Sequence, residues 1–150
     1  MDNRQTIPGY KYYVDPGTGE RPPLHVAFLN IYAAPEGRLN GVVFPISHAL
    51  LRELDRRERN YVRVEVTELL DVGISGRAWA YLGRDDARER FEAARRDTTA
   101  VVSQDYFDAV REEFATVGGL DEFDRSTDRL TVPLRRLTRV DLPPPGPAPR

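Results

Sequence analysis

The apolar residues change their spacing between positions 47 and 66, and this change restricts the chain to folds that combine helix and sheet. Leu51, Leu54 and Glu58 fall at i, i+3 and i+7, so they share one face of a helix. Ser47 lies just before that run, and its hydroxyl can accept a hydrogen bond from a free backbone N–H at a helix start. The run Tyr61–Val66 then alternates valines with polar residues, which predicts a strand with its valine face half-buried. We therefore expect an α+β fold.

Further segments have signals of their own. Short apolar or aromatic runs predict strands at Tyr10–Val14, His25–Tyr32, Leu39–Phe44 and Arg77–Leu82. Asp15–Gly19 contains Pro followed by Gly and predicts a tight turn. Helices are expected at Asp85–Arg96, led by aspartates, and at Ser103–Val117, ended by Gly118 and Gly119. The basic run Arg135–Arg139 is typical of an edge strand with solvated arginines and is only weak evidence for RNA binding.

Size and charge exclude several classes of protein. A chain of 150 residues fits one domain that can bury a full core. Its 22 basic and 24 acidic side chains leave a formal charge of -2, which predicts no recruitment of nucleic acid or anionic lipid. The absence of cysteine and of a long apolar stretch predicts a protein outside the membrane, in the cytoplasm.

Common catalytic motifs are missing. The segment Pro16–Glu20 lacks the Lys-Ser/Thr ending of a phosphate-binding loop, and no dinucleotide glycine fingerprint follows a strand. The two histidines, His25 and His48, have no metal-ligand spacing, so we expect neither a histidine metal site nor a Ser-His-Asp triad.

Glu58 remains as the residue best placed for chemistry, because its carboxylate shares a helix face with two leucines. One interpretation is a partly desolvated carboxylate that serves as general base and then general acid near neutral pH. The alternative is a salt bridge to Arg56, Arg57 or a strand arginine, or a frayed helix end in water. The sequence leaves both open.

Several segments resemble the gamma-glutamylcyclotransferase-like proteins, also called the AIG2-like group. The resemblance rests on Asn40–Phe44, Leu54–Glu58, Tyr61–Val66 and Ala78–Tyr81 in matching order and spacing. Ser103–Tyr106 resembles the Ser-Pro-x-Tyr segment of the family, with Gln104 where Pro is usual. The match extends roughly from Val26 to Gly119.

This resemblance implies a small twisted mixed β-barrel with flanking helices and a cavity. It assigns the acid/base role to Glu58 and places Tyr61 and Tyr106 near the cavity as substrate-binding residues. Family substrates are gamma-glutamyl amines, whose α-amino group attacks the γ-carbonyl to release an amine and form 5-oxoproline. The reaction needs no cofactor and no metal.

One feature departs from the family pattern. Its members begin with a strand and a Tyr-Gly-Ser-Leu type loop whose N–H groups hold the substrate, and we find no such segment here. We therefore expect an N-terminally incomplete domain over residues 1–142, whose exposed edge could be closed by homodimerisation or by Tyr10–Val14, and a disordered Pro-rich tail over 143–150.

Two functions follow as hypotheses. The first is a cyclotransferase acting on a gamma-glutamyl amine, and the second is a non-catalytic domain that binds a small ligand or a partner on the same scaffold.

Overall fold

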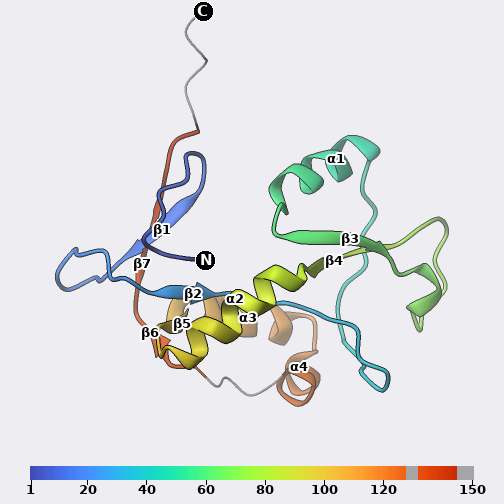
Figure 1. Cartoon of the computed structure of the whole chain (residues 1–150). Helices are drawn as coiled ribbons and strands as arrows, with labels where there is room; N and C mark the ends of the chain where they lie inside the picture. The colour runs from blue at the N-terminus through green and yellow to red at the C-terminus, as the bar shows by residue number, and fades with distance from the viewer. Residues whose placement is uncertain (128–131, 145–150) are drawn as a thin grey trace, which may run out of the picture.

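The computed structural model describes residues 1–127 and 132–144, which form a mixed α+β fold (Figure 1). In chain order the elements are β1 (Lys11–Val14), β2 (His25–Ala27), α1 (His48–Arg57), β3 (Tyr61–Glu65), a 3-10 turn (Thr67–Leu69), β4 (Trp79–Gly83), α2 (Asp85–Arg96), β5 (Ala100–Ser103), α3 (Gln104–Thr116), α4 (Leu120–Ser126), β6 (Leu134–Arg135) and β7 (Thr138–Asp141).

The main core lies around a parallel sheet in the order β2-β5-β6. β5 is buried along its whole length, as expected for a central strand covered on both faces. Two apolar clusters pack on this sheet: Tyr13, Val26, Val101 and Leu137 in one, and Ala94, Ala100, Val102 and Val132 in the other. We call β1, β2, β5, β6 and β7 with α2, α3 and α4 the packed half.

The first residues of the chain extend the packed half. Met1 and Val26 exchange backbone hydrogen bonds of 2.8 Å, and Asn3 N–H donates to Leu24 O. The side chain of Asn3 is fully buried and donates to the carbonyls of Tyr13 and Pro22 at 2.8 and 2.9 Å. Its amide oxygen accepts from Tyr13 N–H at 2.8 Å, so this single side chain joins three segments.

β1 pairs with β7 as an antiparallel ribbon. The turn predicted after β1 is present, because Asp15 accepts hydrogen bonds from Gly17, Thr18 and Gly19. The ribbon lies on the opposite side of the molecule from α1, β3 and β4 (Figure 1).

Residues 39–83, which include α1, β3 and β4, form a second region that we call the open lobe. β3 and β4 pair as a two-stranded antiparallel sheet, and α1 is joined to it by Asp55. The Asp55 carboxylate accepts from Arg63 and from the Tyr81 hydroxyl, both at 2.8 Å. Helix α1 begins as predicted, since Ser47 Oγ accepts from Leu50 N–H.

The predicted burial of β3 is wrong. Its valine face is the exposed one, with Val62 49% and Val64 36% accessible, whereas Arg63 is partly buried. The cause is Asp55 of α1, whose carboxylate pairs with Arg63 on the face of β3 opposite to the valines. The helix therefore covers the polar face of the hairpin.

The predicted strand Leu39–Phe44 is also wrong, because this segment pairs with no strand in the part of the chain that the structure describes and Phe44 is 65% exposed. The predicted strand His25–Tyr32 is shortened to His25–Ala27, after which the chain leaves β5. Apolar composition alone could not define these strands, because a strand also needs a partner for its backbone groups.

The described residues form several sheets and no closed barrel, so the barrel stays a prediction. Most of the expected Pro-rich tail, residues 145–150, lies outside the described residues.

Candidate functional site

The peptide group of Leu29, just after β2, is held between two tyrosines. Its N–H donates to the Tyr106 hydroxyl of α3 at 2.9 Å. Its carbonyl accepts from the Tyr61 hydroxyl at the start of β3 at 3.3 Å. The structure therefore brings together the two tyrosines that the sequence singled out, although they lie 45 positions apart in different halves of the molecule.

Burial raises the pKa of both tyrosines, and for Tyr61 the neighbouring Tyr106 and Glu58 add to the shift. Both hydroxyls consequently stay protonated at neutral pH, and each can act as donor and acceptor. Phe28 packs edge-on against Tyr106 with ring centroids 5.2 Å apart, which fixes the orientation of that ring.

Glu58 lies at the C-terminal end of α1, three residues before Tyr61. Its backbone N–H donates to Leu54 O and its carbonyl accepts from Tyr61 N–H. These two hydrogen bonds stabilise the turn that leads from α1 into β3. Leu51, Leu54 and Glu58 are partly buried, in agreement with the face predicted from their spacing.

The Glu58 side chain is 23% exposed and its carboxylate forms an ion pair of 2.7 Å with Arg57. Arg57 itself is 72% exposed. Repulsion from the Glu58 charge contributes to the raised pKa of Tyr10 and Tyr61, so the carboxylate lies within electrostatic reach of these aromatic side chains. Both interpretations from the sequence have a structural counterpart: the carboxylate is partly desolvated, and it has an arginine partner.

Lys11 on β1 completes this group of residues and was not singled out from the sequence. Its ammonium lies 4.4 Å from the centroid of the Phe28 ring and 5.6 Å from that of Tyr10. The sequence did contain a signal, since Lys11 is the single lysine among 22 basic residues. We call Lys11, Phe28, Glu58, Tyr61 and Tyr106 the tyrosine site.

The tyrosine site combines a carboxylate that can move a proton, two phenol groups and an ammonium. Tyr10 adds a third phenol group, whose pKa is raised chiefly by burial. Such a set suits a small ligand that has both a cationic and an anionic group.

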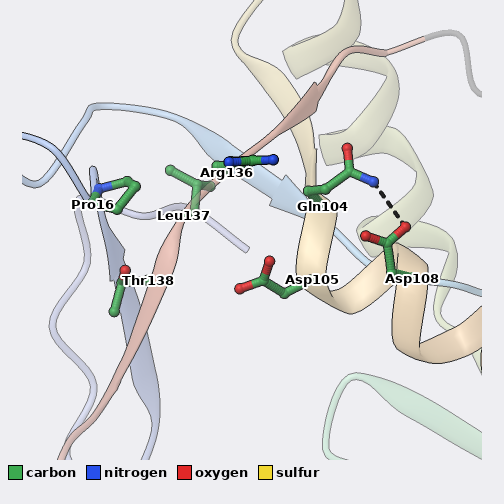
Figure 2. Close-up of a pocket in the computed structure, with 7 residues that line it drawn as sticks. All are labelled: Pro16, Gln104, Asp105, Asp108, Arg136, Leu137 and Thr138. Atoms are coloured by element: carbon green, nitrogen blue, oxygen red, sulfur yellow. Dashed lines mark hydrogen bonds between the residues drawn. The ribbon is translucent and has the colours of Figure 1, made fainter.

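A separate hollow lies between the start of α3 and the segment leading into β7 (Figure 2). Gln104, Asp105 and Asp108 line it from α3, with Arg136 and Thr138 opposite. Gln104 donates to Asp108 at 2.8 Å, as the dashed line in Figure 2 marks. None of the tyrosine-site residues lines this hollow, and we do not assign the chemistry to it.

Within residues 1–127 and 132–144, no group of three or more acidic or histidine side chains could hold a metal ion. In the same residues, no helix combines the length and the apolar character needed to cross a membrane.

Comparison with known proteins gives one family. Residues 2–107 match the family described as "Gamma-glutamyl cyclotransferase, AIG2-like". The matched range includes Glu58, Tyr61 and Tyr106. No curated protein and no solved structure matches the chain.

Proposed function

Because the chain belongs to the gamma-glutamyl cyclotransferase, AIG2-like family, we propose that it cleaves a gamma-glutamyl amide by intramolecular cyclisation. The products are 5-oxoproline and a free amine, and Glu58 is the general acid/base. The observation that supports this most is the position of Glu58, whose partly buried carboxylate lies beside Tyr61 and within electrostatic reach of its ring.

The first step joins the α-amino nitrogen to the γ-carbonyl carbon, while the carbonyl electron pair moves to oxygen. The proton on the attacking nitrogen passes to the Glu58 carboxylate. Glu58 then returns this proton to the leaving nitrogen, the carbon–nitrogen bond of the amide breaks, and the carbonyl re-forms. No water is consumed, and one carboxylate suffices because it acts first as base and then as acid.

Ring closure needs the substrate to be folded so that its amine faces its own carbonyl. Holding the two groups in reacting geometry can supply much of the barrier reduction. In our proposal Tyr61 and Tyr106 bind the substrate and favour the folded conformer, since their hydroxyls stay protonated and their rings offer apolar walls.

The ion pair between Arg57 and Glu58 favours a second candidate, a domain that binds a small ligand without cleaving it. A carboxylate held by a guanidinium is less available as a base. In the cyclisation proposal Arg57 must release Glu58 when substrate binds, which its exposed position permits.

Release of 5-oxoproline from a panel of gamma-glutamyl amino acids and glutathione tests the proposal. We expect turnover by the wild type and a loss of at least 100-fold in kcat for Glu58→Gln, which retains the shape but cannot transfer the proton. Glu53→Gln, an exposed change on the same helix, is the matched control and should retain activity. Equal turnover by Glu58→Gln would contradict the acid/base assignment, and binding of a gamma-glutamyl amide without turnover would favour the second candidate.

The closed barrel, the cytoplasmic location and a homodimer belong to the same proposal, since the family resemblance and the sequence suggest them.

A further inference from the structure

Lys11 is placed differently from the arginines around it. Among the described residues its ammonium forms no ion pair, whereas the nearby Arg139 is paired with Asp141 at 2.6 Å. Asp141 lies opposite Lys11 in the β1–β7 register and would be the natural ion-pair partner. Its carboxylate is instead paired with Arg139. Lys11 is left above an aromatic ring.

The direction of Lys11 follows from the strand. Lys11 and Tyr13 lie on the same face of β1 because side chains two positions apart share a face. Tyr13 belongs to the core, and its ring lies 6.5 Å from that of Phe28. The Lys11 ammonium is therefore drawn inward over the Phe28 ring, while the residue as a whole stays partly exposed.

Contacts connect Lys11 to the rest of the tyrosine site. Phe28 lies under the ammonium and packs against Tyr106, whose hydroxyl binds the Leu29 peptide that also accepts from Tyr61. Burial lowers the pKa of Lys11, and the nearby Arg139 charge lowers it further. Asp141 and, to a smaller extent, Glu58 act in the opposite direction by stabilising the charged form. A ligand anion would offset the cost of burial.

The substrate class proposed above has matching charges. In a gamma-glutamyl amide the α-carbon bears both the attacking amine and a carboxylate. A base that reaches the substrate amine therefore also lies near the substrate carboxylate. A cation placed near that carboxylate is the complementary arrangement. Lys11, which lies within electrostatic reach of Glu58, provides that cation.

We propose that Lys11 binds the α-carboxylate of the substrate and thereby selects gamma-glutamyl groups over amides that lack this carboxylate. The inference rests on the proposed function for the identity of the substrate. A compact ammonium with three donors can follow the carboxylate as the ring closes, whereas a planar guanidinium is suited to one fixed geometry.

Two cyclic probes test the assignment by calorimetry. 5-Oxoproline contains the carboxylate, and 2-pyrrolidinone is the same ring without it. We expect the wild type to bind 5-oxoproline at least tenfold more tightly than 2-pyrrolidinone. Lys11→Met, which keeps the apolar stem over Phe28, should abolish this difference, and Lys11→Arg should restore part of it. Arg52→Met, the same loss of charge at an exposed site, should bind like the wild type.

A second measurement uses the wild type alone and does not depend on the folding of a variant. Because Lys11 is the only lysine, an amine-acylating reagent labels only Lys11 and the chain terminus. 5-Oxoproline should slow acylation of Lys11 at least fivefold, and 2-pyrrolidinone should not.

Equal binding of the two probes to the wild type, unchanged preference in Lys11→Met, or no protection of Lys11 would each overturn the inference. Failure of the proposed function looks different: 5-oxoproline protects Lys11, yet no gamma-glutamyl amide is turned over. Turnover of a gamma-glutamyl amide without protection of Lys11 by 5-oxoproline would support the proposed cyclisation but exclude Lys11 from substrate binding.

Discussion

The packed half and the open lobe bury their apolar residues to very different extents. Among the described residues the packed half contains Val26, Val101 and Leu137 at 4% exposure or less. The open lobe buries only Ala78, while its other apolar side chains stay in contact with solvent, including Leu39, Val42, Val43, Phe44, Val62, Val64, Leu69 and Val72. The buried apolar core thus lies in one region, and two of the five tyrosine-site residues, Glu58 and Tyr61, lie in the other.

This difference has a consequence for the site. Lys11, Phe28 and Tyr106 belong to the packed half, whereas Glu58 and Tyr61 belong to the open lobe. The two regions are joined at the site by the Tyr61–Leu29 hydrogen bond and nearby by Asn30, whose side chain accepts from Gly83 N–H at 2.7 Å. A side chain at position 83 would displace the amide group of Asn30 and so break its hydrogen bond with the backbone of residue 83. Regions with few buried apolar contacts open most easily, so substrate binding can draw the two regions together.

Asn3 gives the sharpest test of where stability resides. Asn3→Asp keeps the shape but replaces the two donors that serve Tyr13 and Pro22 by an anion. A buried anion facing carbonyl oxygens should lower the free energy of unfolding by roughly 3–5 kcal/mol at pH 7, measured by urea denaturation. Asn40→Asp, the same change at an exposed position of the open lobe, is the control and should cost under about 0.5 kcal/mol. Similar losses in the two variants would remove the distinction between the regions.

Two valines compare the regions with the same substitution. Val26→Ala removes fully buried methyl groups from the main core and should cost about 2 kcal/mol. Val62→Ala on the exposed face of β3 should cost under about 0.5 kcal/mol. Urea denaturation of both variants measures the difference. A cost for Val62→Ala close to that for Val26→Ala would mean that another segment or a second chain covers the valine face in solution.

The features that were predicted best from the sequence are those fixed by residues close to one another in the chain. The Ser47 cap, the face shared by Leu51, Leu54 and Glu58, and the turn at Asp15 are all present, since each is fixed by neighbours a few residues away. The mixed α+β class and the family were also predicted correctly.

Features that depend on distant partners were missed. Nothing near Val62 indicates that Asp55 will bring α1 to the arginine face of the hairpin, and nothing near Leu39–Phe44 indicates the absence of a pairing strand. β5 was overlooked because a run of only four buried residues resembles the start of the following helix. Lys11 joins the site through β1 and β7, which lie far apart in the sequence.

Tyr61→Phe tests the connection between the two regions. Removing the hydroxyl deletes the bond to Leu29 O, which should cost about 0.5–1 kcal/mol because the net value of one such hydrogen bond is small. The loss should fall on the open lobe: native-state hydrogen exchange should become faster in β3 and β4 and stay unchanged in β2 and β5. Tyr81→Phe, which removes a hydroxyl bond to Asp55 inside the lobe, is the matched control. If the two variants accelerated exchange in β2 and β5 as much as in β3 and β4, the regions would open as one unit, and closure of the lobe on substrate would lose its basis.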